Sequence, residues 1–358
     1  MLLGTSSVYK PAVVSVIIVC YNNGPFIYDA LRSTLSQDYP AIELVVSDDC
    51  SEHGFEPQRI KRFIEKYNKG NITNVIVNVN ARNYGTVRHL EMLRERCHGE
   101  YEISIAADDV WRDCHVISAF VGMFEKLGDE ALWIVSQVEM CDAHMNSIQR
   151  VFVADEVIRM ISERNLTGLL NLECHSCILP GLGSAFRKKF FEQIDRLSDN
   201  YCLVEDYSTQ LRALRKGIIP YYLDYVTARH RSGGVSHGNE HNNNRVYLKL
   251  LADYIHIFEN EVLPYWQMFS FFNFCKGFIK YIIHIERYKK EDACSSNGKD
   301  EDKICADPIA YNYGFVSKRL NDARISHRFF WIVFSHAVKI FAVVYVVLSN
   351  MVKNIKMK

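Results

Sequence analysis

Short runs rich in apolar residues alternate with segments of helical periodicity in the first hundred positions. Residues 13–20 (VVSVIIVC) are rich in β-branched side chains, which is typical of a parallel strand covered on both faces. Similar runs occupy residues 42–47, 74–79 and 101–106. Between them, residues 26–37, 58–67 and 87–97 have the spacing of amphipathic helices. This alternation predicts βα units, a mostly parallel sheet and right-handed crossovers.

Carboxylate pairs follow two of the predicted strands. Asp48 and Asp49 close the second strand, and Asp108 and Asp109 close the fourth. A single Asp after a strand is often only a turn or cap residue, but the carboxyl edge of an open α/β sheet is also where ligands bind. Two such pairs favour a ligand-binding site at this edge. Their hard oxygen ligands suit Mg²⁺ or Mn²⁺.

Five segments in a fixed order resemble family 2 glycosyltransferases of the GT-A fold. Residues 14–51 resemble the opening of that family, residues 80–85 its Asn-x-Gly segment, and residues 99–111 the strand that carries its D-x-D signature. Residues 205–217 resemble its Glu-Asp motif, and residues 221–236 its closing strand and loop. The resemblance covers residues 13–237. It implies an α/β fold with a Rossmann-like, mostly parallel sheet flanked by helices, and inverting transfer of a sugar from a nucleotide-activated donor.

The resemblance also assigns the metal site. Asp108 and Asp109 would hold a Mn²⁺ or Mg²⁺ ion and the adjacent ribose. The first acidic position of the D-x-D pattern falls on Ala106, which leaves two readings open. Either Asp108 meets the ribose and Asp109 the metal, which is the favoured reading, or a carboxylate is missing and metal binding is weakened or lost.

The remaining donor-binding residues are likewise implied by the family. Asp49 matches a carboxylate that reads a pyrimidine, with Asp48 beside it, so a UDP-linked donor is expected. The base pocket would include Val19, Tyr21 and Asn22. Phosphate contacts would come from Arg82, for which a solvated surface position is an equal alternative, and from Arg229 and Arg231 in a lid formed by residues 229–236.

A general base is needed because an alcohol is a poor nucleophile at neutral pH. Asp206 matches the family's base, and Glu205 is the fallback. Both residues begin a predicted helix, so they can also act as N-terminal charges. A helix N-terminus is expected to lower the pKa of Asp206 and keep it ionised.

Composition narrows the function classes. Forty-two Lys and Arg balance 42 Asp and Glu, so nucleic-acid binding has little support. Eleven cysteines without a recognisable signal peptide suggest free thiols in a reducing cytoplasm. The single C-x-x-C, Cys174 and Cys177, is expected to pack rather than bind metal.

The sequence predicts three regions. Residues 1–240 form the glycosyltransferase domain, and residues 241–325 a helical region with a charged linker at 286–303. Residues 326–358 form a basic, apolar, membrane-associating helix, in which residues 329–352 are interrupted by only one charge, Lys339. An interfacial helix is favoured, while a buried helix and a membrane span remain alternatives.

A cell-surface polysaccharide enzyme at the cytoplasmic face of the bacterial plasma membrane would fit this layout. Its acceptor would be a glycan or a lipid-linked glycan, recognised by residues 144–200 and the C-terminal helices. The alternative is a catalytically impaired nucleotide-sugar-binding or scaffold protein of the same fold, with Ala106 as the lesion.

Overall fold

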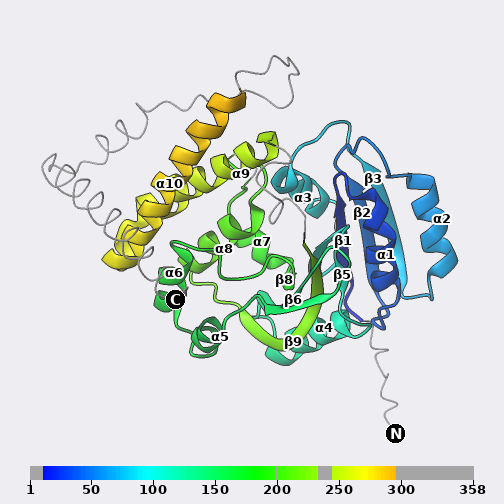
Figure 1. Cartoon of the computed structure of the whole chain (residues 1–358). Helices are drawn as coiled ribbons and strands as arrows, with labels where there is room; N and C mark the ends of the chain where they lie inside the picture. The colour runs from blue at the N-terminus through cyan, green and yellow to red at the C-terminus, as the bar shows by residue number, and fades with distance from the viewer. Residues whose placement is uncertain (1–10, 198–199, 233–243, 296–358) are drawn as a thin grey trace, which may run out of the picture.

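A nine-stranded mixed sheet flanked by helices organises the chain (Figure 1). This computed structural model describes residues 11–197, 200–232 and 244–295. The strand order is β3-β2-β1-β4-β8-β6-β9-β5, with β7 paired to β6. The helices that precede the closing strand are α1 (Ile27–Leu35), α2 (Pro57–Tyr67), α3 (Thr86–Arg94), α4 (Val116–Leu127), α5 (Asp155–Ser162), α6 (Leu166–Glu173), α7 (Lys189–Gln193) and α8 (Glu205–Arg215).

The first half of the sheet is parallel, as the sequence predicts. Strand β1 (Val14–Cys20) lies between β2 (Ile42–Asp48) and β4 (Tyr101–Ala106), and β3 (Ile72–Val79) pairs with β2. The register aligns Cys20 with Asp48 and Val19 with Ala106. The carboxyl ends of three strands are therefore level, and the two Asp pairs follow directly from that edge.

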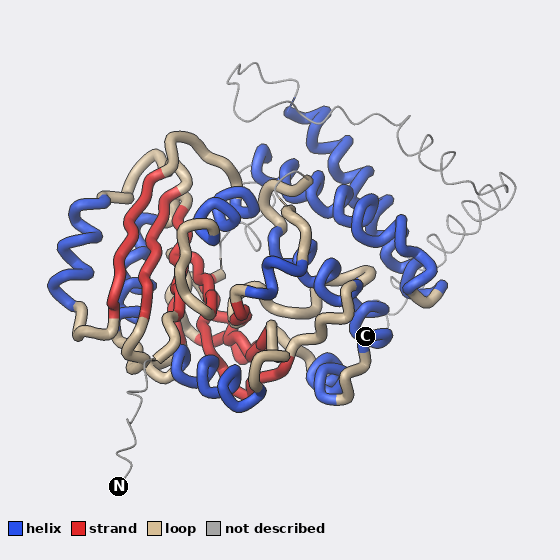
Figure 2. The backbone as a smooth tube through the Cα atoms, turned by 180° about the vertical axis from the view of Figure 1, so that it is seen from behind, coloured by secondary structure: helices blue, strands red, loops and turns tan. Residues whose placement is uncertain are grey.

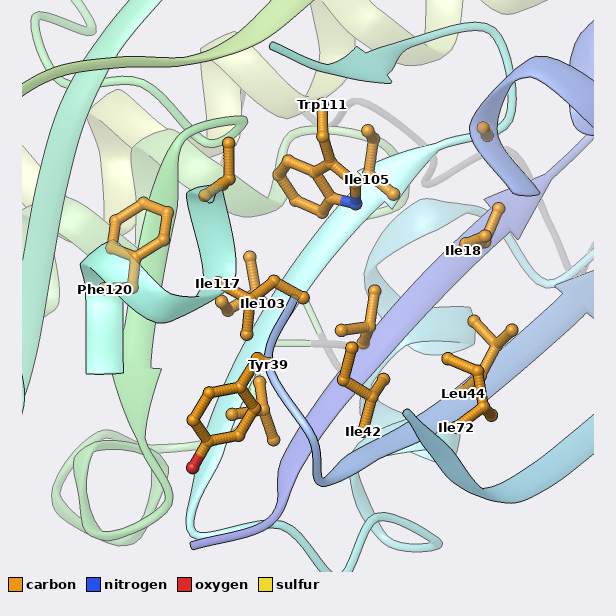
Figure 3. Close-up of a cluster of buried hydrophobic side chains, with 14 of the residues drawn as sticks. Ile18, Tyr39, Ile42, Leu44, Ile72, Ile103, Ile105, Trp111, Ile117 and Phe120 are labelled. Carbon is orange, nitrogen blue, oxygen red and sulfur yellow. The ribbon is translucent and has the colours of Figure 1, made fainter. Parts of the chain in front are cut away.

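One hydrophobic cluster fixes these strands. Figure 3 shows Ile18, Ile42 and Ile103 from β1, β2 and β4 packed near Ile117 and Phe120 from α4. Helix α1 buries residues 27, 30, 31, 34 and 35, which is the apolar face predicted from its periodicity. Burial on both faces of β1 and β2 explains why their sequences are mostly apolar, whereas the edge strand β3 is largely exposed.

The second half of the sheet is mixed. Strand β8 (Ser184–Arg187) is antiparallel to β4 and to β6 (Trp133–Cys141), whereas β6 is parallel to β9 (Tyr221–Arg231). Strand β7 (Ser147–Val151) pairs with the end of β6, and β5 (Val110–Trp111) is antiparallel to β9. The β5–β9 pairing brings the end of β9 beside the aspartates that precede β5.

The helices after residue 240 pack into the core of this second half. Helices α9 (Asn244–Ile257) and α10 (Phe271–Ser295) contribute Ile255, Phe274 and Ile279 to the cluster that also contains Trp133 of β6 and Leu211 of α8. Figure 2 shows both helices from behind, lying across the helical side of the molecule. The described part of the region predicted at 241–325 is therefore helical, and it shares a core with the domain predicted at 1–240.

Two boundaries differ from the sequence prediction. The apolar spacing of residues 262–287 predicts one helix, but helix α10 begins only at Phe271, and a short 3-10 segment, Leu263–Met268, precedes it. Helix α10 then runs to Ser295, through the first ten residues of the stretch predicted as a linker at 286–303. The rest of that stretch and the predicted helix at 326–358 lie outside the described residues. No helix in the described part of the chain combines the length and the apolar character needed to cross a membrane.

Candidate active site

The turns that follow β1 and β2 are fastened to each other. The Asn22 backbone N–H donates to the Ser51 hydroxyl at 2.7 Å, and the Glu52 N–H donates to Asn22 Oδ1 at 3.1 Å. Asp48 accepts hydrogen bonds from the backbone N–H and the hydroxyl of Ser51. Tyr21 is 41% exposed beside this turn. Predicted base-pocket residues are thus brought together, with an aromatic side chain accessible at the edge and Val19 half-buried below it.

Asp49 anchors the loop between β3 and α3. Its buried carboxylate accepts from the side-chain amide of Asn80 at 2.8 Å and from the N–H groups of Tyr84 and Gly85 at 2.9–3.0 Å. Arg82 lies in this loop, exposed, with its guanidinium over the Tyr84 ring. Because both oxygens of Asp49 already accept from the protein, its evident role is to shape the loop that carries Arg82.

Asp108 and Asp109 lie between β4 and β5, and their surroundings differ. Asp109 accepts from the Arg231 N–H at 2.9 Å and contacts His230 Nδ1 at 3.0 Å. No hydrogen bond from another described side chain reaches the Asp108 carboxylate. Burial, and then the negative charge of Asp109, raise the pKa of Asp108 to about 6. For His230, burial opposes protonation, but the hydrogen bond and charge of Asp109 outweigh it and leave the pKa raised.

The two arginines of the predicted lid, Arg229 and Arg231, lie in strand β9 and not in a loop, and both are engaged with other parts of the protein. Arg229 forms an ion pair with Glu139 at 3.0 Å and donates to the Met145 carbonyl. Arg231 donates to the backbone carbonyls of Asp108 and Ala143, and its guanidinium lies 4.4 Å from the centre of the Phe26 ring. These arginines hold the edge of the site together. Residues 233–236 of the predicted lid lie outside the described residues.

The carboxylates at this edge of the sheet suit a metal ion that is also coordinated by a bound ligand. Within the described ranges, no group of three or more His, Cys, Asp or Glu side chains could hold a metal ion by itself. Two adjacent carboxylates are nevertheless present, and that of Asp108 is buried and accepts no hydrogen bond from another described side chain. Mg²⁺ is commonly held by one or two carboxylates together with substrate phosphates and water. Asp108 and Asp109 therefore suit a cation whose other ligands come from a bound diphosphate.

Glu205, the fallback base, is part of a buried ion-pair group. The Arg94 guanidinium contacts Glu205 and Glu102, each at 2.7 Å, and lies 4.0 Å from the centre of the Phe191 ring. This arrangement ties the N-terminal turn of α8 to α3 and β4. Glu205 is therefore already neutralised by a cation and is poorly suited to accept a proton.

Asp206, the next residue of that turn, also lies beside β4. It lines a cavity of about 10 Å³ together with Ser104 and Gly181. A Cβ atom on Gly181 would lie 2.9 Å from the Cβ of Asp206, so glycine is needed for this close approach. The expected lowering of the Asp206 pKa is wrong. Burial, and then the charge of Glu205, raise it to about 6 despite the Tyr207 N–H that donates at 2.8 Å.

Two further residues that position the site were missed by the sequence analysis. Asp253 of α9 accepts from three consecutive N–H groups, residues 202–204, at 2.6–3.0 Å, and so fixes the loop that leads into α8. Arg94 has the role described above. Both act across sequence separations of about fifty residues or more, for which the chain carries no local motif.

The C-x-x-C pair shows no redox or metal arrangement. Cys174 and Cys177 are free thiols, and burial raises the pKa of both. A raised pKa keeps a thiol protonated and unreactive. Their surroundings agree with the packing role expected from the sequence.

Comparisons with known proteins agree with this geometry. The model of glycosyltransferase-like family 2 matches residues 11–248. An uncharacterised glycosyltransferase of Rickettsia conorii is 24% identical over 220 residues, 59% of this chain and 32% of that protein. The teichuronic acid biosynthesis glycosyltransferase TuaG of Bacillus subtilis, a putative assignment, is 31% identical over 104 residues, 29% of this chain and 38% of its own length. The alignments thus span about a third of each relative.

Among solved structures, a mannosyltransferase of Pyrobaculum calidifontis, solved with GDP-Man and Mn²⁺, aligns with a TM-score of 0.50 and 15% identity. The alignment covers 94% of this chain and 87% of that one, and it supports the fold alone. The predicted GT-A architecture is confirmed. Because the family model covers well over half of the sequence, the chain belongs to glycosyltransferase-like family 2, which confirms the family and the transferase class predicted from the sequence.

Proposed function

We propose that this chain transfers a sugar from a UDP-linked donor to a hydroxyl of a glycan or lipid-linked acceptor, with inversion, in cell-surface polysaccharide biosynthesis. The observation that carries the proposal is the common edge of the sheet: the register of β1, β2 and β4 places both Asp pairs there, while Asp206 faces β4 near the same end. The name of the Bacillus subtilis relative supports the polysaccharide assignment.

In this mechanism Asp206 takes the proton of the acceptor hydroxyl. The acceptor oxygen forms its bond to the anomeric carbon while the bond from that carbon to the diphosphate oxygen breaks, and the electron pair leaves with UDP. With a pKa of about 6, Asp206 is ionised at neutral pH yet remains a stronger base than an ordinary aspartate. Arg94 holds Glu205, and through it the first turn of α8, in place for this step.

Donor binding would use the fastened turns and the loop that Asp49 anchors. Tyr21 and Asn22 are exposed and suit contact with the base and ribose, whereas Asp48 is buried and holds their turn through Ser51. Arg82 is the exposed cation of the loop. A Mn²⁺ or Mg²⁺ ion held by Asp108 and Asp109 would neutralise charge on the diphosphate. His230 orients Asp109 for that role.

The experiment is a thermal-shift comparison of UDP, GDP and their sugars, each with and without Mn²⁺, followed by an assay of donor hydrolysis. Metal-dependent stabilisation by UDP together with slow hydrolysis of a UDP-sugar is the expected result. Stabilisation by GDP alone would overturn the donor assignment. The second candidate, a nucleotide-sugar-binding protein without turnover, is favoured by Ala106 and by the engaged arginines. It predicts UDP binding without hydrolysis and no effect of Asp206→Asn.

We also place the protein on the inner face of the bacterial plasma membrane. In the described part of the chain, two exposed aromatic side chains lie near the start of α10: Trp266 of the preceding 3-10 segment is 47% exposed and Phe271 is 68% exposed. Residues 318–358 contain eight Lys or Arg and one Asp, a composition that favours anionic lipid. Flotation with phosphatidylglycerol vesicles should be weakened by Phe271→Ser and unaffected by Val79→Ser, which removes an exposed apolar side chain elsewhere. Equal flotation of both variants would show that these aromatic side chains do not contribute to membrane binding.

A further inference from the structure

A cavity separate from the carboxyl edge of the sheet opens between α10, α9 and the segment that joins α6 to β8. It has a volume of about 520 Å³, within the range of about 300–1,000 Å³ that is usual for small-molecule sites. Its lining along α10 runs from Gly277 to Arg287, which is about 15 Å at about 1.5 Å per residue. Gly277 allows close packing here, because a Cβ atom would lie 2.7 Å from the Cys174 carbonyl oxygen. The space is therefore elongated and follows the helix.

Aromatic and aliphatic side chains form much of the wall. Phe258 and Tyr281 stack with their ring centres 4.8 Å apart, and the ring of Tyr254 lies 5.0 Å from that of His284. Ile257 also lines the cavity, and none of the described lining residues is acidic. Such a wall stabilises a ligand mainly by removing its apolar surface from water.

The buried ionisable groups that line the cavity are held in their uncharged forms. Burial, and then neighbouring positive charges, lower the pKa of His175 and bring that of His284 to about 4. Burial also raises the pKa of Cys174, Cys177 and Tyr254. Both histidines are therefore neutral at physiological pH, and the thiols and the phenol keep their protons. A neutral lining in a partly desolvated space favours an apolar ligand over an ion.

The mouth of the cavity combines apolar and cationic side chains. Ile283 lines the cavity and is 40% exposed, and the exposed Lys280 and Arg287 line it as well. Phe272 is exposed about three turns before Ile283, on the same side of α10, and Ile282 is exposed beside it. Figure 1 shows α10 at the side of the molecule opposite α2. Exposed apolar side chains of α10 therefore continue to the mouth, where two cations would meet the phosphate of an entering lipid.

We propose that this cavity binds the hydrocarbon chain of a phosphate-bearing lipid, with the phosphate at the mouth beside Lys280 and Arg287. The inference rests on the proposed function and deepens it, because it gives a lipid-linked acceptor a binding place for its chain. The elongation along α10 suits a chain, and the uncharged wall keeps the phosphate out of the interior. Two sources offer this chemistry: the isoprenoid of a lipid-linked acceptor and the acyl chain of a membrane phospholipid.

The test is calorimetric titration of the full chain with farnesyl phosphate and, separately, with inorganic phosphate. Farnesyl phosphate should bind much more tightly, because burial of the chain supplies most of the affinity. Ile283→Asn should weaken its binding about five- to tenfold, as expected when one partly exposed aliphatic side chain leaves the contact. The matched control is Ile282→Asn, which changes a neighbour of nearly equal exposure that does not line the cavity, and should leave the affinity unchanged. UDP affinity should be the same in all three proteins.

A second lipid then separates the two sources. Tighter binding of farnesyl phosphate than of lysophosphatidylglycerol supports a lipid-linked acceptor, and the reverse order supports a membrane phospholipid. The proposal is overturned if the two variants bind farnesyl phosphate equally, or if inorganic phosphate binds as tightly as the lipids. It is also overturned if the full chain binds neither lipid, the result expected if its own apolar residues 329–352 filled the cavity. If UDP fails to bind while the Ile283-dependent lipid binding persists, the proposed function fails and the lipid site stands.

Discussion

Replacing Asp206 by Asn should stabilise the fold while it removes catalysis. Since the pKa of Asp206 is raised from 3.8 to about 6 in the folded protein, the folded state binds this proton more tightly than the unfolded chain. The carboxylate therefore destabilises the fold above about pH 6, by up to about 3 kcal/mol at about 1.4 kcal/mol per pKa unit. This penalty shrinks as the pH falls through 6 and disappears below the unfolded value. Asn removes the ionisable group and keeps an acceptor for the Tyr207 N–H.

The raised pKa of Asp206 also determines how the turnover rate depends on pH. A base with a pKa of about 6 is roughly 90% ionised at pH 7 and roughly 10% ionised at pH 5. The turnover rate should therefore fall about tenfold per pH unit below pH 6, which forms the acidic limb of the pH–rate profile. Asp206→Asn should lower the turnover rate by about 10²–10⁴-fold and abolish this acidic limb. The assays are initial rates of UDP release across the pH range and urea unfolding at the same pH values. An Asn variant that is less stable than the parent at neutral pH, or that retains the acidic limb, would refute the reasoning.

Glu205→Gln is the matched control on the adjacent residue. It removes one of the two carboxylates that neutralise the buried Arg94, so it should destabilise the fold by roughly 1–3 kcal/mol, less than the loss of a lone buried partner because Glu102 remains. The acidic limb should persist and move to slightly lower pH, because the charge of Glu205 contributes to the raised pKa of Asp206. If this variant loses the limb and Asp206→Asn keeps it, Glu205 is the base.

Three further predictions concern the donor site and its supports. Asp109→Ala should abolish the Mn²⁺ dependence of UDP binding in a calorimetric titration, and an unaltered titration would remove Asp109 from the metal site. Gly85→Ala should destabilise the fold by about 1–3 kcal/mol in urea unfolding, because φ is +80° and the new Cβ would lie 2.6 Å from the Cys202 carbonyl oxygen. The control Gly122→Ala, in open space on α4, should instead stabilise the fold by about 0.5–1 kcal/mol. Equal effects of the two substitutions would contradict the steric argument. Asp253→Ala should cost about 1–3 kcal/mol or more, because three N–H groups lose their acceptor, and should also slow turnover; an unchanged turnover would separate this loop from catalysis.

The carboxyl edge of the sheet could be predicted because its signals are local. Unbroken β-branched runs specify strands that are buried on both faces, and parallel pairing brings their carboxyl ends to one edge. The Asp pairs after β2 and β4 therefore lie at that edge, independently of how the rest of the chain folds. The strand bounds agree within about two residues, even for the edge strand β3, which is largely exposed.

The electrostatics of the site could not be predicted in this way. A helix N-terminus lowers the pKa of an exposed aspartate, yet for Asp206 burial against Gly181 and β4 dominates and reverses the sign. The sequence places Glu205 and Asp206 side by side but does not show that Arg94, 111 residues earlier than Glu205, pairs with only the first of them. The division of roles between two adjacent carboxylates depends on the packing of distant segments.

The C-terminal helix α9 helps to position Asp206, the proposed base. Asp206 is held on one side by β4 and Gly181, and the turn that carries it is tied to α3 through Glu205. The third support is the loop before α8, which Asp253 of α9 holds by three backbone hydrogen bonds.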